Sequence, residues 1–139
     1  MGTWDFGPFD NDAAADFAGE LDDAAPDERA ALVRAALDRA AATVGYLESD
    51  DGEPAVAAAA LVAAQCPGGE PVDPAYGPKE PIPGIGRALV EPALRALDRV
   101  LGAESELAEL WDDSGEGPRW RERLGRLRAA LGPWGGDPG

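Results

Sequence analysis

Carboxylates are the side chains of this chain whose spacing most resembles a chemical site, and one group stands near the start. Asp10, Asp12 and Asp16 are two to four residues apart, as the ligands of a calcium loop are. An EF-hand loop beginning at Asp10 would also need glycine where Ala15 stands and a bidentate acid where Leu21 stands. We therefore interpret these acids as helix caps, whose short side-chain oxygens accept hydrogen bonds from free backbone amides.

A second acidic group lies between two predicted helices and is interpreted as a connector that opens the later helix. It consists of Glu48, Asp50, Asp51 and Glu53. Such a group can hold a divalent cation weakly, or it can form a solvated turn and N-cap. We name its four acids, together with Tyr76, as candidate contacts for a partner.

The groups that most enzymes use are missing from the sequence. The chain has no histidine, which removes the commonest general base and the usual zinc ligand. Cys66 is the single cysteine, so it has neither a disulfide partner nor a histidine to activate it. Gly84-Ile85-Gly86 is only a fragment of a phosphate-binding pattern, with no strand before it and no third glycine at the required place. We predict no enzymatic activity, no catalytic residue, no metal and no cofactor.

The charge of the chain is strongly negative and unevenly distributed. Its 139 residues carry a formal net charge of -15. Residues 1–80 hold 17 acidic and 4 basic residues, whereas residues 81–139 hold 10 and 8. Such a field repels nucleic acids and anionic membranes and attracts basic proteins. The alternative is that the acidity serves only solubility.

Five arginines are concentrated in the last predicted helix, and two interpretations suit them. They could bind a ligand that carries phosphate, or they could neutralise the acidic first half of the same molecule. We favour the second interpretation. The five are Arg119, Arg121, Arg123, Arg126 and Arg128.

Apolar residues recur mostly with helical spacing, which predicts an all-α fold: one domain over residues 1–139, a small bundle of about five or six helices. The predicted helices cover approximately 12–23, 26–45, 53–65, 85–101, 106–112 and 119–131. In the second, Val33, Leu37, Ala40 and Val44 share the apolar row. Pro92 either kinks the fourth helix or stands in its first turn. A proline- and glycine-rich loop is expected over 67–83, and a mobile tail over 132–139.

The opening segment combines aromatic residues with a strong helix-start signal. We predict that Trp4, Phe6 and Phe9 close one end of the core, and that Asp10, Asn11 and Asp12 begin the first helix. The segment does not resemble a signal peptide. The most apolar run, 55–64, is too short to cross a bilayer. We expect a cytoplasmic protein without membrane contact.

Several stretches of the chain together resemble a known family. Met1-Gly2-Thr3-Trp4 and the following 7–17 are similar to the opening of a bacterial family of small proteins, frequent in actinobacteria and filed as a domain of unknown function. Members begin M-G-x-W-G-x-G-x-F-D-N-D, and Asp5 departs from that pattern. Residues 46–48, 55–64 and 105–111 match later landmarks. The resemblance implies a small helical domain and a bacterial setting, and it implies no activity.

The leading hypothesis is a non-enzymatic, acidic protein-binding module whose partner is a basic protein, such as a nuclease or toxin that it would restrain. The motivation is the acidic first half together with the missing catalytic groups. The alternative hypothesis is a helical domain that binds a small molecule or a metal in a cleft beside the 67–83 loop.

Overall fold

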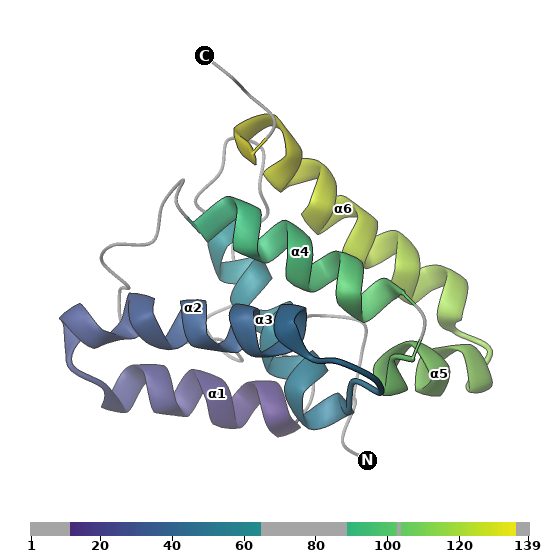
Figure 1. Ribbon diagram of the computed structural model, residues 1–139, viewed down its shortest axis with the longest axis horizontal. Coiled ribbons are helices and arrows are strands. Elements are labelled where there is room, and N and C mark those ends of the chain that lie inside the picture. Colours follow the sequence, from purple (N-terminus) through teal and green to yellow (C-terminus); the bar gives the residue numbers. More distant parts are fainter. Residues whose placement is uncertain (1–11, 65–88, 103, 136–139) are drawn as a thin grey trace.

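The computed structural model describes residues 12–64, 89–102 and 104–135, and within these ranges the fold is all-α, as the sequence predicts. The described residues form six helices and no strand; Leu47 and Ser105 alone form an isolated parallel bridge. The helices, drawn in Figure 1, are α1 (Asp12–Asp23), α2 (Pro26–Ala42), α3 (Ser49–Ala64), α4 (Val90–Leu101), α5 (Glu106–Asp113) and α6 (Gly117–Gly135).

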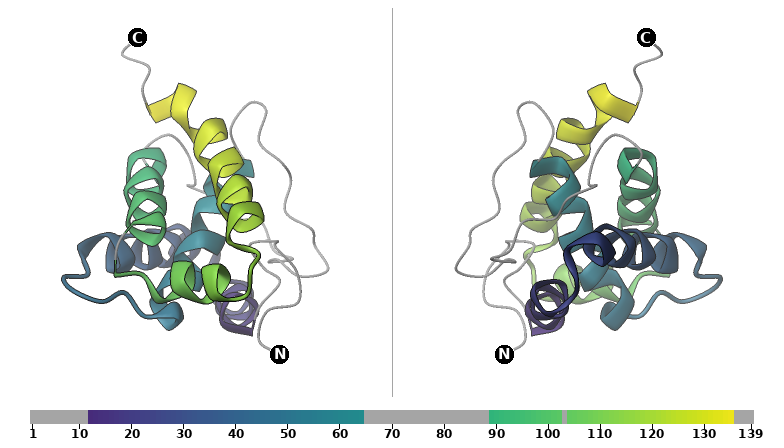
Figure 2. Two further views of the ribbon diagram at one scale, coloured as in Figure 1. Left: turned by 90° about the vertical axis from the view of Figure 1, so that its right-hand side faces the viewer. Right: turned by 90° about the vertical axis from the view of Figure 1, so that its left-hand side faces the viewer.

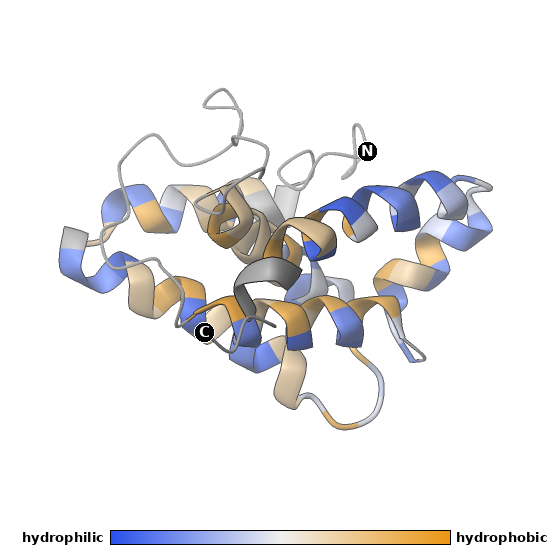
Figure 3. Cartoon of the chain, turned by 90° about the horizontal axis from the view of Figure 1, so that it is seen from above, coloured by the Kyte–Doolittle hydropathy of each residue, from blue (hydrophilic) through white to orange (hydrophobic). Residues whose placement is uncertain are grey.

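The centre of the bundle is α3, which contacts all five other helices. Every residue from Ala55 to Ala63 is buried. Alanine permits this because its small side chain lets helices approach closely from several sides. Figure 3 shows the difference in hydropathy: the outer helices alternate hydrophobic and hydrophilic residues, whereas the central helix carries few hydrophilic ones. A helix that is apolar on all sides is expected to be buried in this way.

The first two described helices, α1 and α2, lie side by side, with α2 crossing in front of α3 and α1 below α2 in Figure 1. Pro26 begins α2, as expected for a residue whose missing N–H is not needed in the first turn. The apolar row of Val33, Leu37 and Ala40 is fully buried. The prediction for Val44 was wrong, because α2 ends at Ala42 and the Val44 side chain is 96% exposed.

Two local features end α2 before Val44. The Thr43 hydroxyl donates to the Arg39 carbonyl at 2.6 Å, and the Thr43 backbone is extended. Gly45 has a positive φ of 86°, a conformation in which a side chain is strained. The chain therefore leaves the helix axis before the apolar row reaches its next turn.

The fourth helix follows the second of the two predicted arrangements. It begins at Val90, so Pro92 stands in its first turn and breaks no hydrogen bond of a preceding helix. Val90, Ala93, Leu97 and Val100 are fully buried. Figure 2 shows α4, α3 and α6 running roughly upright, with α5 lying across below them.

The last two helices lie where the sequence predicts them, with bounds that differ by a few residues. Ser105 is the N-cap of α5, and its hydroxyl accepts a hydrogen bond from the Ala108 amide at 3.4 Å. In α6, Trp120, Leu124, Leu127 and Leu131 are all buried. This helix is longer than predicted: it begins at Gly117 and continues to Gly135, so the first four residues of the predicted 132–139 tail are helical.

The largest difference from the predicted elements is the start of α3, since the acidic connector is the beginning of the helix. Asp50 and Asp51 occupy its first turn, where negative charge interacts favourably with the helix dipole. Pro54 consequently lies inside the helix, one turn later than predicted. The early start is stabilised by a contact from far along the chain, because the Glu106 carboxylate accepts from the Ser49 amide at 2.7 Å.

Several predictions concern residues outside the described ranges. They are the closing of the core by Trp4, Phe6 and Phe9, the caps Asp10 and Asn11, the 67–83 loop, Tyr76 and residues 136–139. Asp12 lies within the described chain and is the first residue of α1.

Candidate functional site

The candidate partner contacts of the acidic group lie at one end of the molecule, at the lower right of Figure 1. Glu48 and Asp50 are exposed, whereas Asp51 and Glu53 are half-buried. The structure places α5 beside them, and α5 brings its own acids from more than 50 residues later in the chain. Remote acidic segments therefore meet at the junction of α3 and α5.

Backbone pairing fixes this junction. The Leu47 amide donates to the Glu104 carbonyl at 2.7 Å, and the Glu106 amide donates to the Leu47 carbonyl at 2.8 Å. Leu47 and Ser105 are buried at the same point. These bonds hold the segment that enters α3 against the segment that enters α5, so the positions of the two helix starts are coupled.

Arg99 of α4 further restrains the loop between α2 and α3. Its guanidinium donates to the carbonyls of Thr43, at 3.3 Å, and of Gly45. It also donates to the Glu104 carbonyl at 3.5 Å. Arg95 of the same helix pairs with Glu91 on the exposed side. Arg99 instead fastens two loops to each other.

Exposed apolar side chains stand on both segments of this junction, the loop before α3 and α5 itself. Tyr46 is 48% exposed and Leu110 is 52% exposed, and with Val44 they are the large hydrophobic residues that the described chain exposes. The Tyr46 hydroxyl donates to the Glu109 carboxylate at 3.0 Å, which joins the loop to α5. We call this surface the α3–α5 face and define it by Val44, Tyr46, Glu48, Asp50, Glu109, Leu110 and Asp113.

The carboxylates of the face act on the Tyr46 phenol. Partial desolvation, the hydrogen bond to Glu109 and the negative charges of Glu109, Glu106 and Asp113 raise the pKa of this phenol above its ordinary value. A raised pKa in the folded state means that the interaction contributes its full stability below the unfolded-state pKa. That contribution is lost as the pH rises through the folded-state pKa, so it is present at neutral pH.

This electrostatic setting gives a measurable titration. In a Tyr76→Phe background, Tyr46 is the remaining tyrosine, and its phenolate absorbance is expected to appear at higher pH than that of a free tyrosine. Glu109→Gln should lower the pKa, because it removes the nearest negative charge while keeping an acceptor for the hydroxyl. An unchanged titration in that variant would contradict the proximity of Tyr46 and Glu109.

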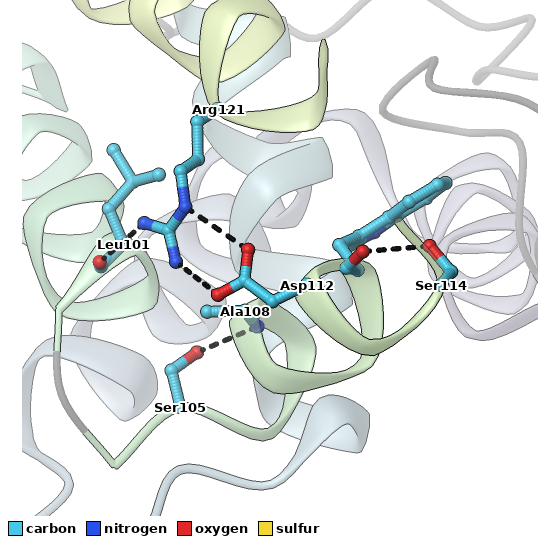
Figure 4. Close-up of polar contacts among 7 residues, drawn as sticks. Leu101, Ser105, Ala108, Asp112, Ser114 and Arg121 are labelled. Carbon is cyan, nitrogen blue, oxygen red and sulfur yellow. Dashed lines mark hydrogen bonds and ion pairs between the residues drawn. The ribbon is translucent and has the colours of Figure 1, made fainter. Parts of the chain in front are cut away.

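The opposite side of α5 is anchored to α6 and is structural. Arg121 binds the Asp112 carboxylate through two nitrogens, at 2.8 and 3.4 Å, and donates to the Leu101 carbonyl at 3.2 Å (Figure 4). Its guanidinium lies 5.7 Å from the Trp120 ring centroid. Trp111 stacks on Trp120 with ring centroids 6.4 Å apart. These contacts set α5 rigidly, so its outer side presents a fixed surface.

The arginines of α6 pair with acids, but with acids of their own half of the chain. Arg119 pairs with Glu116, Arg126 with Glu122 and Arg128 with Asp98, in addition to the pair of Arg121 with Asp112. The expectation that these arginines pair with the acidic first half was therefore wrong for these four arginines, because each ion pair is made with an acid of the second half. The physical reason is position: α6 contacts α4 and α5, which supply Asp98 and Asp112, and the part of the first half that it contacts is α3, whose buried run from Ala55 to Ala63 carries no acid.

Within the described ranges, the structure shows neither a metal-binding cluster nor a membrane-spanning helix. No group of three or more carboxylates or cysteines in these ranges is arranged to hold a metal ion. Within the same ranges, no helix combines the length and the hydropathy needed to traverse a bilayer.

The fold and this surface define a small all-α helical bundle with an acidic face. The chain belongs to a family that is described as a domain of unknown function (DUF4259), whose model matches residues 2–123. The matched region includes α1 to α5 and the whole α3–α5 face. Searches of curated proteins and of solved structures found no match.

The α3–α5 face could be predicted only in part. Its acids at 48–53 are visible as a charge run in the sequence. The contribution of α5 was missed, because Glu106 and Glu109 reach Ser49 and Tyr46 across more than 50 residues. The sequence pattern that could have indicated it is the row of acids at helical spacing, Glu106, Glu109 and Asp113, with the apolar Leu110 beside it.

Proposed function

We propose that this protein is a non-enzymatic protein-binding module that binds a basic protein through the α3–α5 face. The observation that carries the proposal is the convergence of acids from two remote segments around exposed apolar side chains. Apolar contacts supply most of the binding energy in such interfaces, while charges around them direct the encounter and the choice of partner.

The charges of the face are available for a partner. Glu48, Asp50 and Asp113 make no ion pair with any residue in the described ranges. No cationic side chain in the described ranges therefore neutralises these three carboxylates. A basic surface is attracted to their negative field at a rate that falls as salt is added. The overall charge of -15 reinforces the preference and disfavours nucleic acid.

The test compares two variants with the same change in net charge. The face variant carries Asp50→Asn and Glu109→Gln, and the control variant carries Asp27→Asn and Glu20→Gln. Asp27 and Asp50 are both second residues of helices, so the two variants lose a similar helix-dipole interaction. Glu20 and Asp27 are exposed near the junction of α1 and α2, away from the face.

Each protein is immobilised, and proteins from a bacterial extract are captured at low salt and eluted with a salt gradient. The wild type and the control variant are expected to retain the same basic proteins, and the face variant is expected to release them at clearly lower salt. Equal retention by all three proteins, or retention that salt does not affect, would contradict the proposal.

A further inference from the structure

The exposed apolar side chains of the α3–α5 face, together with the acids beside them, indicate which kind of partner segment binds there. Tyr46 and Leu110 are about half exposed, and the Tyr46 hydroxyl is held by one oxygen of Glu109. This bond fixes the position of the phenol, so a partner need not order it on binding. Glu109 and Asp113 lie close enough to affect the Tyr46 phenol electrostatically. An aromatic ring, an aliphatic side chain and carboxylates are thus presented together.

The same molecule shows how such a combination binds a cation. Arg121 forms a two-nitrogen contact with Asp112 while its guanidinium lies over the Trp120 ring. Arg128 makes a similar contact with Asp98, at 2.7 and 3.1 Å. A guanidinium suits these arrangements because it is planar and can stack on a ring while it binds both oxygens of a carboxylate. A lysine ammonium is a compact, strongly hydrated point charge, which neither stacks flat on a ring nor binds both carboxylate oxygens in a planar fork.

We infer that the α3–α5 face receives a partner segment in which an arginine and an aliphatic residue are neighbours. The inference rests on the proposed function and specifies the partner. The arginine stacks on Tyr46 and pairs with the carboxylates of Glu109 and Asp113. The aliphatic side chain covers Leu110, which removes exposed apolar surface from water. Charge complementarity selects the cationic occupant, and the exposed ring selects arginine over lysine.

A second copy of the chain does not fit this role. Two molecules of net charge -15 repel each other. In addition, Arg121 and Arg128 of α6 already bind Asp112 and Asp98 within the chain. A separate basic protein is the occupant with the required charge.

The test uses three short acetylated and amidated peptides with the full-length chain at low salt. The first contains Arg-Leu-Arg-Leu, the second replaces each arginine by lysine, and the third replaces each leucine by glycine. Binding is followed by the backbone amide shifts of the isotope-labelled protein. We expect the Arg-Leu peptide to bind about fivefold more tightly than the lysine peptide, since stacking on the ring favours the guanidinium. Its shifts should be concentrated at 44–50 and 106–113.

A variant of the protein isolates the apolar contact. Leu110→Ser changes a half-exposed residue and should leave the fold intact. This variant is expected to bind the Arg-Leu peptide only as tightly as the glycine peptide. Its affinity for the glycine peptide should equal that of the wild type. Asp27→Asn serves as the control and should change the affinity for each peptide by no more than about twofold.

The outcomes separate the inference from the proposed function. Equal binding of the arginine and lysine peptides at the face, or equal binding of the leucine and glycine peptides, would overturn the inference and leave a less selective basic-partner surface. Shifts that avoid 44–50 and 106–113 for all three peptides would overturn both the inference and the proposed binding face.

Discussion

Replacement of Ala59 by leucine is expected to lower the free energy of unfolding by about 3 kcal/mol. Ala59 is fully buried in α3, the helix that contacts all five others. A leucine there adds methylene and methyl groups where neighbouring helices leave no room, so backbones must move apart or side chains must leave their preferred rotamers. Denaturant unfolding followed by circular dichroism measures the change.

The matched control for this change is Ala35→Leu in α2. Ala35 is exposed, and leucine and alanine both favour helix, so we expect a change within about 0.5 kcal/mol. If Ala59→Leu were tolerated as well as Ala35→Leu, α3 would not be the close-packed centre of the bundle. The alanine run would then need another explanation.

Replacement of Arg29 by methionine is expected to destabilise the protein by a similar amount, about 3 kcal/mol. Arg29 is only 5% exposed. Its Nε donates to the Leu21 carbonyl at 2.7 Å, and its Nη2 donates to the Asp22 carbonyl at 3.3 Å. These carbonyls belong to the last turn of α1, where intrahelical donors run out, and the Leu21 carbonyl otherwise accepts only from the Ala24 amide, at 3.3 Å, among the backbone groups of the described chain. Methionine fills most of the volume but supplies no hydrogen bond.

Two further variants show whether hydrogen bonding is the cause. Arg29→Lys keeps the charge and reaches fewer carbonyls, so its stability should lie between those of the wild type and Arg29→Met. Arg34→Met removes an exposed arginine of the same helix, which pairs with Asp38 at 3.5 Å, and should cost less than about 1 kcal/mol. Equal losses of stability in Arg29→Met and Arg34→Met would show that the hydrogen bonds from Arg29 to the end of α1 add no stability.

The sequence predicted the elements whose signals are local. The predicted starts at 26 and 106 agree with the structure, where Pro26 begins α2 and Ser105 caps α5. The helix predicted over 119–131 is also present, with Trp120, Leu124, Leu127 and Leu131 buried. Each depends on residues within one or two helical turns, where propensity, capping and periodicity act directly. The burial of α3 was predictable because the run from Ala55 lacks charged residues.

The predictions failed where distant residues decide the outcome. The start of α3 depends on the Glu106 carboxylate, which accepts from the Ser49 amide, and no local pattern reveals that contact. The role of Arg29 was missed for the same reason, since a buried arginine and a solvated one look identical in a sequence. The α3–α5 face is likewise assembled from residues more than 50 positions apart.

The fold and the candidate site are linked through these distant contacts. Arg99 fastens the loop that carries Tyr46, and the Arg121–Asp112 pair with its stacked tryptophans fastens α5. The face therefore combines a rigid support with an exposed surface of apolar and acidic side chains. A preorganised surface of this kind loses little conformational entropy when a partner binds.

The most direct test of the central claim is to determine which carboxylates touch a captured basic partner. A carbodiimide joins a carboxylate to a lysine amine of a protein in contact with it, and mass spectrometry identifies the linked residues. We predict links at the face, at Glu48, Asp50, Glu109 or Asp113. Links confined to the acids near the junction of α1 and α2, at Glu20, Asp22, Asp23 and Asp27, would contradict the assignment of the α3–α5 face as the binding surface.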